Sequence, residues 1–305
     1  RAVENFGYSR YWIAEHHNSI GYACASPEIL IGYIAASTSR LKVGAGGVMI
    51  SNYSPLKVAE TFKTLTSLFP GRIDLGIGRA SGADPIATRA LQGTAGVRND
   101  HIERIQLLLG FLHDGLDEAH EYALVEAVPS AAEVPDLCLL GSTLETAKAA
   151  ARLGLPFCFA RFFNSTGAAE AFELYRGSFQ PSKYLDSPKC SIAVSALCAD
   201  SQAEAAKLAS SAELWQVRAM KGLQTKVPDA TEAMAYAYDA EEQEQLARIR
   251  SRTITGDTGS VASTLQALAR SLQVDEIFVL TVCHNQQARV RSYSRLANFL
   301  LNGRL

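Results

Sequence analysis

A carboxylate and two imidazoles stand side by side near the start of the chain, in the stretch AEHHN at residues 14–18. Glu15, His16 and His17 directly follow the hydrophobic run SRYWI, which is typical of a buried strand. Carboxyl and imidazole groups are the usual side chains for proton transfer near neutral pH. A strand-end histidine that only hydrogen-bonds a backbone carbonyl is the simpler alternative, and the sequence alone leaves both open.

A metal site is the weaker interpretation of the same residues. Successive side chains of a strand point to opposite faces, so at most two of the three can share one side while the strand continues. Three consecutive ligands therefore fit poorly to the one-sided geometry of a two-histidine, one-carboxylate metal centre. We expect catalytic or ligand contact from Glu15 and His16, and no metal.

Glycines interrupt the next strand-like run, LKVGAGGVM at residues 41–49. Glycine weakens a strand, so Gly44, Gly46 and Gly47 indicate either the close approach of a flat ligand to the backbone or a strained peptide. A tight turn is the alternative explanation. We expect Gly46 and Gly47 to contact a cofactor.

A third run, RIDLGIGRASGAD, combines a strand with glycines and a cation. Its spacing, Gly76-x-Gly78-x-x-x-Gly82, departs from the G-x-G-x-x-G pattern of dinucleotide-binding folds, and no helix pattern opens at once. Arg79 at the end of this strand is better explained as an anion contact, with a surface salt bridge as the alternative.

The stretch LLGSTLETA places Gly141, Ser142 and Thr143 between a strand and a helix. A helix N-terminus exposes unpaired N–H groups and a partial positive charge, which stabilise a phosphate. An ordinary helix start explains the same residues equally well, with Ser142 as N-cap and Glu145 as its capping-box partner.

β-like runs and amphipathic helical segments alternate along most of the chain, which predicts a parallel sheet. Seven strands are expected, at residues 9–16, 41–49, 72–78, 136–140, 156–160, 190–199 and 276–282. Helices are expected at residues 26–39, 54–69, 98–113, 142–154, 166–177, from about 201, at 257–271 and at 285–301. The fold class is therefore α/β, and a closed (β/α)₈ barrel would place its eighth strand ahead of Arg1.

Two stretches break the alternation, at residues 114–135 and 222–250. Since the chain shows no repeats, we interpret both as insertions in one barrel domain over residues 1–305. The second is polar and acidic in its second half, so we expect part of a mobile lid or an insertion with little core.

The composition favours a globular protein with a large core, since 48% of residues are hydrophobic and the net charge is only −2. No basic face points to nucleic acid, and no apolar run reaches the roughly 18 residues of a membrane helix. No signal peptide is recognisable, so a cytoplasmic location is expected. Without C-x-x-C spacing, reduced thiols are expected at Cys24, Cys138, Cys158, Cys190, Cys198 and Cys283.

Four stretches taken together resemble the luciferase-like flavin monooxygenases, the family of bacterial luciferase, and in particular its single-chain oxidoreductases. They are RYWIAEHHN, VGAGGVMISNYSPLKVAETFKTL, FPGRIDLGIGRASGAD and LLGSTLETAKAAARLGLPF. The resemblance implies a (β/α)₈ barrel that binds reduced FMN at the C-terminal rim and uses O₂ as cosubstrate. It also implies a separate flavin reductase as partner, a small-molecule substrate and a homodimer or larger homo-oligomer.

The resemblance assigns roles by position. Glu15 and His16 match the acid and the catalytic histidine near the flavin ring, and Gly46-Gly47 matches a non-prolyl cis peptide under it. Arg79 matches the phosphate-binding arginine. Gly141, Ser142 and Thr143 match the phosphate loop.

The chain departs from the family pattern in two places. The family's first strand and most of its first helix have no counterpart here. After strand 156–160, a small residue and a histidine before an aromatic are replaced by Arg161-Phe162-Phe163. The expected function is oxygenation of an aldehyde, a sulfonate or another small organic molecule, with a deazaflavin (F420)-dependent dehydrogenase or a non-catalytic flavin-binding barrel as alternatives.

Overall fold

The computed structural model describes residues 1–80, 82–92, 101–113, 115–130 and 133–301. The chain divides into two compact units. Unit 1 holds residues 9–18 and 23–140 together with Arg1, and unit 2 holds residues 2–8, 19–22 and 141–305. The expectation of a single domain stays a prediction.

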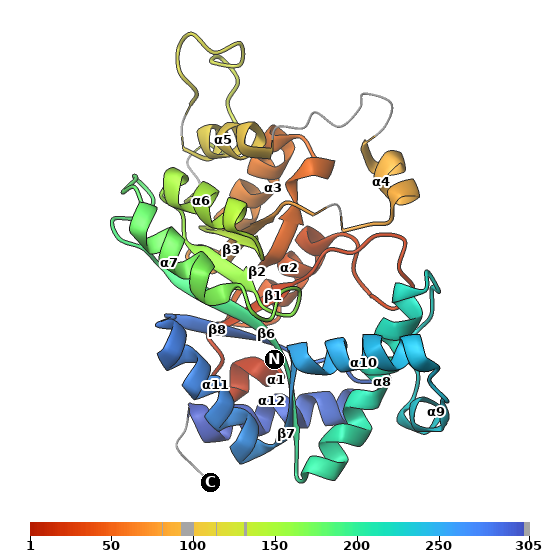
Figure 1. Cartoon of the computed structure of the whole chain (residues 1–305). Coiled ribbons are helices and arrows are strands. Elements are labelled where there is room, and N and C mark those ends of the chain that lie inside the picture. The colour runs from red at the N-terminus through yellow and green to blue at the C-terminus, as the bar shows by residue number, and fades with distance from the viewer. Residues whose placement is uncertain (81, 93–100, 114, 131–132, 302–305) are drawn as a thin grey trace. The chain divides into compact units, whose positions relative to one another are not determined.

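Unit 1 alternates parallel strands with helices (Figure 1). Its strands are β1 (Arg10–Ile13), β2 (Lys42–Met49), β3 (Ile73–Gly78) and β4 (Asp136–Gly141), whose last residue already belongs to unit 2. Its helices are α2 (Pro27–Ala36), the short 3-10 helix η1 (Ile50–Asn52), α3 (Pro55–Leu68), α4 (Pro85–Gln92) and α5 (His101–Leu112). Each strand pairs in parallel with the next, which confirms the four predicted strands.

Helix starts in unit 1 follow the predicted serine-proline steps. α2 begins at Pro27 and α3 at Pro55, because a proline at the first helical position loses no hydrogen bond. Neither Ser26 nor Ser54 makes a side-chain capping bond. Helix 98–113 corresponds to α5, and residues 98–100 of that prediction lie outside the described residues.

A charged network occupies the N-terminal half of this sheet. Arg10 Nη1 lies 2.6 Å from Asp74 Oδ1 and 3.3 Å from Asp136 Oδ2, and Lys42 Nζ lies 2.5 Å from Asp136. Trp12 Nε1 donates to the other oxygen of Asp74 at 2.7 Å. Burial raises the pKa of Asp74, and its bonds to Arg10 and Trp12 oppose that rise. The buried carboxylate thus ties β1 to β3.

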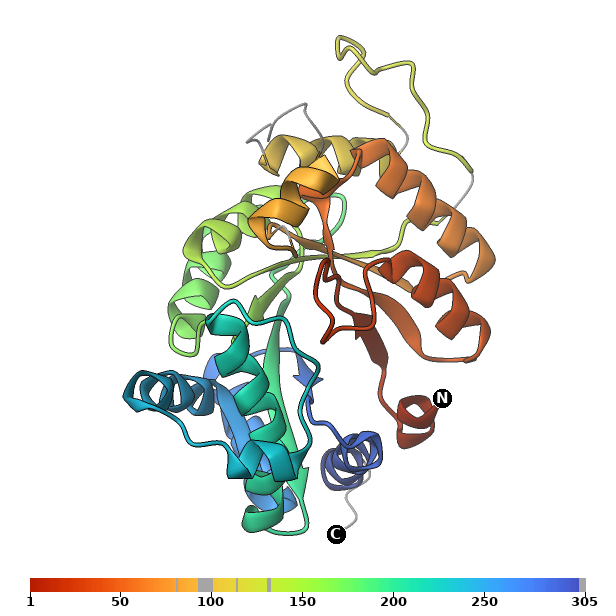
Figure 2. The ribbon, with the colours of Figure 1, turned by 90° about the vertical axis from the view of Figure 1, so that its right-hand side faces the viewer.

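Unit 2 continues the alternation. Its strands are β5 (Phe157–Ala160), β6 (Cys190–Ala199), β7 (Thr253–Asp257) and β8 (Glu276–Leu280). Its helices are α1 (Ala2–Phe6), α6 (Leu144–Leu153), α7 (Ala168–Ser178), α8 (Gln202–Met220), α9 (Ala230–Ala235), α10 (Ala240–Arg252), α11 (Thr258–Leu272) and α12 (Gln286–Leu300). Figure 2 shows α1, in red, beside α12, in blue, where Tyr8 Oη donates to the Tyr293 carbonyl at 2.9 Å.

The count of seven strands was wrong, because β7 is an eighth strand that the sequence analysis did not count. Both β7 and β8 pair in parallel with β6, and Ser195 is the partner of Thr253 in one and of Leu280 in the other. One residue cannot pair with two strands on the same edge, so β7 and β8 lie on opposite edges of β6. β5 pairs with the first residues of β6, and β7 continues its edge.

Two buried hydroxyls complete the β8 edge of β6. Thr281 Oγ1 donates to the Ala196 carbonyl at 2.7 Å, and Ser292 Oγ accepts from the Cys198 N–H at 3.0 Å. Both side chains are almost fully buried. The backbone groups of β6 beyond the end of β8 are therefore bonded by side chains in place of a strand.

The stretch 222–250 contains two helices, α9 and most of α10, and its apolar core is larger than its polar composition predicts. Leu246 and Ile249 of α10 are buried against Val217 of α8. Glu242, 2% exposed, accepts hydrogen bonds from Lys221 Nζ at 2.6 Å and from Tyr236 Oη at 2.8 Å. By contrast, residues 115–130 form turns without helix or strand.

All six cysteines are free thiols, and Cys138, Cys158, Cys190 and Cys198 are buried. None of the helices in the described ranges combines the length and the apolar character that crossing a bilayer requires.

Acid should loosen the α8–α10 packing through Glu242. The Lys221 ammonium, the Asp239 amide and the Tyr236 hydroxyl lower the pKa of Glu242 to about 2. The pKa of a glutamate in an unfolded chain is about 4.3. The stability contributed by the bonds of ionised Glu242 is therefore complete above that pH and is lost as the pH falls towards 2. In thermal unfolding, Glu242→Gln should lower the Tm at pH 7, and its difference from wild type should shrink below pH 4.

Glu244→Gln is the matched control, because Glu244 is exposed on the same helix. A Tm difference between wild type and Glu242→Gln that stays constant from pH 7 to pH 3 would contradict the assignment.

Candidate active site

The buried carboxylate of Glu15 is the centre of the candidate site. Glu15 is 1% exposed and follows β1 at the C-terminal end of the unit 1 sheet. Its Oε2 accepts the Met49 N–H at 3.1 Å, and its Oε1 accepts from Tyr53 Oη at 2.9 Å and lies 2.8 Å from His17 Nε2. A carboxylate oxygen accepts, so His17 presents Nε2–H to it. Glu15 thus joins the β1 loop to the end of β2.

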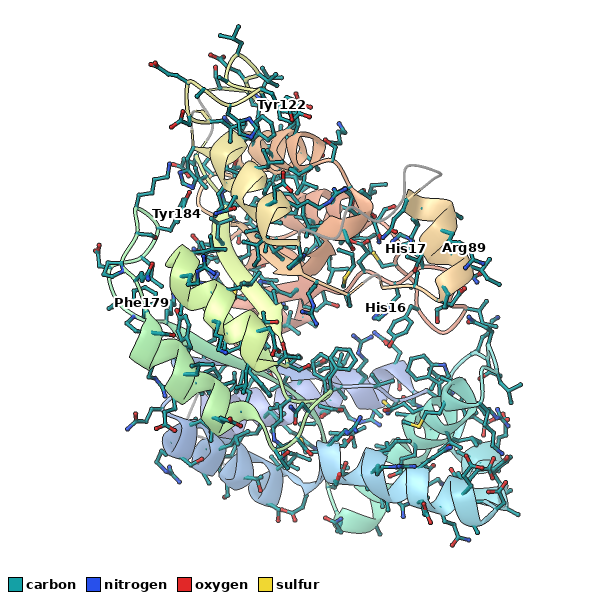
Figure 3. The ribbon with its side chains drawn as sticks, turned by 45° about the horizontal axis from the view of Figure 1, so that its top comes forward. His16, His17, Arg89, Tyr122, Phe179 and Tyr184 are labelled. Atoms are coloured by element: carbon teal, nitrogen blue, oxygen red, sulfur yellow. The ribbon has the colours of Figure 1, made fainter. Side chains whose placement is uncertain are left out.

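The loop after β1 is fixed on its other side by the segment ahead of α4. β1 ends at Ile13, so Glu15 and both histidines lie in a loop, and the alternation of strand side chains does not limit their directions. The backbone N–H of His17 donates to the Gly82 carbonyl at 2.8 Å, and Asn18 Nδ2 donates to the Asp84 carboxylate at 2.7 Å. Figure 3 shows both histidines on this loop.

The surroundings of His16 favour the neutral form of its imidazole. The backbone N–H of His16 donates to the Cys24 carbonyl at 3.1 Å, which fixes the backbone of the loop. Burial lowers the pKa of the His16 imidazole, and the neighbouring His17 lowers it further. A neutral imidazole can accept a proton at one ring nitrogen while the other donates, as a general base requires.

The glycines of β2 allow close packing between β2 and β3. The Gly46-Gly47 peptide bond is cis, as the resemblance implies. These two residues lie opposite Gly76 alone, which makes a bulge in the pairing of the two strands. A Cβ on Gly47 would lie 2.8 Å from the Gly76 carbonyl oxygen, and one on Gly44 would lie 2.4 Å from that of Asp74. Contact between strands therefore accounts for Gly44 and Gly47 without any ligand.

Arg79 follows β3 directly and is exposed. Within the described ranges it forms no ion pair, which argues against the surface salt bridge considered above. A guanidinium offers up to five N–H donors in a planar fork that matches a phosphate or carboxylate. Its chemistry therefore fits an anion site.

The loop between β4 and α6 belongs to unit 2. Helix α6 begins one residue later than expected. Thr143, not Ser142, is the N-cap of α6, and its Oγ1 accepts from the Thr146 N–H at 3.3 Å. Ser142 instead presents its carbonyl to Asn164 Nδ2 at 3.2 Å. Gly141 packs against the Thr146 side chain, where a Cβ would lie 2.5 Å from Oγ1. The proposed capping box of Ser142 with Glu145 was wrong, because the strand runs on to Gly141.

Tyr53 is a residue of the site that the sequence reasoning missed. It lies in the plain stretch SNYSP, far from Glu15 in the chain, and no spacing rule connects the two. Burial raises the pKa of its hydroxyl well above the ordinary value, and the Glu15 carboxylate adds to that rise. Tyr53 therefore stays protonated and donates to Glu15.

The family model described as luciferase-like monooxygenase matches residues 1–282 of the chain. The chain belongs to the luciferase-like monooxygenase family. A luciferase-like monooxygenase of Escherichia coli strain K12 is 39% identical over 293 residues, which cover 96% of this chain and 87% of that protein. An N-acetyl-S-alkylcysteine monooxygenase of Bacillus subtilis is 34% identical over 302 residues, which cover 98% of this chain and 90% of the relative.

Solved structures confirm the fold of this luciferase-like chain. The crystal structure of apo-MsnO8 matches it with a TM-score of 0.88 at 37% identity, covering 98% of this chain and 89% of that one. More distant likenesses show the fold alone: the FMN complex of the oxygenating constituent of 3,6-diketocamphane monooxygenase (TM-score 0.70, 17% identity) and an F420-dependent secondary alcohol dehydrogenase (0.69, 13%). The predicted fold class, the α/β barrel type of bacterial luciferase, is confirmed.

Removing the Glu15 carboxylate from this luciferase-like site should be costly. Glu15→Ala leaves three part-buried donors without their acceptor, and an unpaired donor costs about 1–3 kcal/mol when it is fully buried. We expect a loss of about 2 kcal/mol or more in the free energy of unfolding, measured by urea titration. Tyr53→Phe, which removes one donor, should cost about 1 kcal/mol. A loss below roughly 0.5 kcal/mol for Glu15→Ala, the range of ordinary surface substitutions, would show that these bonds do not form.

Proposed function

We propose that the chain is a flavin-dependent monooxygenase that uses reduced FMN and O₂ to oxygenate a small organic substrate. One oxygen atom would enter the substrate, and the other would leave as water with the two electrons and two protons of reduced FMN. A separate flavin reductase would supply the reduced FMN. The similarity to relatives named monooxygenases, at 34% and 39% identity, supports oxygenation over the dehydrogenase chemistry named for a fold neighbour at 13%.

The observation that carries the proposal is the arrangement of proton-handling groups around Glu15. His17 and Tyr53 both bond to its Oε1, and Oε2 holds the Met49 N–H, two residues beyond the cis Gly46-Gly47 bond. A general acid or base needs a fixed ring and a restricted protonation state. The loop holds the His17 ring against Glu15, and burial lowers the pKa of the neighbouring His16.

The residues present fit a flavin phosphate. Arg79 is an exposed guanidinium that forms no ion pair with a described residue, and phosphate is its natural partner. The α6 start offers backbone N–H groups beside the hydroxyls of Ser142 and Thr143. Following the resemblance, we assign Arg79, and independently the Gly141–Thr143 loop, to the phosphate. We assign Gly46 and Gly47 to the ring.

In this proposal the chain's own groups position the reaction and handle its protons. When bound, reduced FMN supplies the electrons with which O₂ is activated. His16, whose pKa burial lowers, accepts or donates a proton at its ring nitrogens. Glu15 acts through its hydrogen bonds, since it fixes His17 Nε2–H and the Tyr53 hydroxyl and with them the loop that carries His16.

His16→Ala should lower turnover by roughly 10²-fold or more, the usual contribution of a positioned acid or base, and leave FMN affinity nearly unchanged. Turnover is followed as oxygenated product from reduced FMN, O₂ and a panel that contains an aldehyde, an alkanesulfonate and an N-acetyl-S-alkylcysteine. Unchanged turnover together with a large loss of FMN affinity would instead make His16 a binding residue.

Arg79→Ala should weaken FMN by roughly tenfold to a few hundredfold, because a charged hydrogen bond contributes about 1.5–3 kcal/mol. Arg79→Lys should keep part of the affinity, since lysine offers one compact charge in place of a fork. Riboflavin has the ring without the phosphate, so its weaker binding should respond to neither substitution. Flavin fluorescence measures all three proteins.

Equal losses for FMN and riboflavin would mean that Arg79 contacts the ring or only supports the fold. The same titration, extended to F420, tests the cofactor. Tighter binding of F420 than of FMN would favour the deazaflavin-dependent dehydrogenase, and binding of neither would exclude both enzymes.

A further inference from the structure

Arg161, Phe162 and Phe163 directly follow β5, in the segment 161–167 that we call the β5 tip. The backbone N–H of Arg161 donates to the Ala193 carbonyl of β6 at 2.9 Å, so the tip starts at the C-terminal end of a parallel strand. In α/β barrels this end of the strands carries the substrate site. The residues of the tip are thus placed where substrate contacts are expected.

The side chain of Arg161 is a half-buried cation without an acidic partner. Its hydrogen bond to the Arg252 carbonyl is long, 3.4 Å from Nη1, and none of the acidic side chains in the described ranges pairs with it. Burial lowers the pKa of the guanidinium. Partial loss of hydration disfavours the charge unless an anion offsets it, and four of the five N–H donors remain for that anion.

The bonds of the β5 tip separate Arg161 from the phosphate loop. Asn164 Nδ2 donates to the Ser142 carbonyl ahead of α6. Arg161 instead extends to Arg252, the residue before β7, and β7 lies beyond β5 along the same edge of β6. The guanidinium is therefore directed to the β7 side of the tip, whereas Asn164 bonds to the loop ahead of α6.

An aromatic pair follows this cation directly in the sequence. The ring centroids of Phe162 and Phe163 are 4.6 Å apart, and Phe163 is 61% exposed. An exposed aromatic residue beside a rim cation offers apolar surface that a ligand can cover.

We propose that Arg161 binds the carboxylate or sulfonate group of an amphipathic substrate whose apolar arm packs on Phe162 and Phe163. The inference rests on the proposed function, since it specifies the substrate of the same reaction. It narrows the small organic substrates to organic anions and disfavours neutral aldehydes.

Calorimetric titration of the full chain, with and without FMN, tests the proposal with nonanoate, octane-1-sulfonate and octan-1-ol as probes. These share one apolar arm and differ in the head group. We expect both anions to bind at least about tenfold more tightly than the alcohol, the usual effect of one charged contact. Arg161→Gln, which keeps an N–H donor for Arg252, should remove this preference without changing octan-1-ol binding. Arg161→Lys should keep part of it.

Arg152→Gln is the matched control, because Arg152 is an exposed arginine of α6 in the same unit. Equal binding of anions and alcohol to the wild type, or an equal loss for all probes in Arg161→Gln, would overturn the proposal. A loss of FMN affinity with unchanged anion binding would make Arg161 a phosphate contact. An anion preference that persists in a chain that binds no FMN would refute the proposed function but leave the Arg161 assignment in place.

Discussion

The geometry of the candidate active site depends on one buried carboxylate. Glu15 is bonded by a backbone amide of β2, a tyrosine hydroxyl and an imidazole, from segments that the chain order keeps apart. Without an acceptor at this position, three part-buried donors would lose their partner, and the loop of the histidines would lose its bond to Met49 of β2. A side chain that first suggests acid–base chemistry thus has contacts suited to orienting other groups, which is the role that we propose for it.

Local pattern was sufficient for most of the fold. Both ends of strand 190–199 were predicted correctly, because charged residues flank the apolar run, Lys189 before it and Asp200 after it. Both serine-proline steps start helices where expected. β7 was not counted as a strand, because it has only five residues and follows the end of α10 directly. Its strand conformation depends on pairing with β6. Similarly, α10 buries Leu246 and Ile249 within a segment whose average composition is polar.

The candidate site was predictable residue by residue only where chemistry and position coincide. Glu15, His16 and Arg79 lie at or just after the C-terminal ends of strands, so their types and places could be read together. Tyr53 could not be found in this way, because its role depends on a bond to a residue 38 positions away. The N-cap of α6 depends on whether β4 ends at residue 140 or 141, and a one-residue difference at a strand end exceeds what local preferences resolve.

The covering of β6 has a consequence for the protein outside its folded state. A ten-residue apolar strand with an open edge is a template on which another chain can pair, and this is how many sheet proteins aggregate. Here β5 and β7 occupy one edge in succession, and β8, Thr281 and Ser292 occupy the other. The pairing of β7 with β6 therefore also protects the strand from association. A relative without β7 would have to blunt residues 195–199 by other means, such as a charge or a proline.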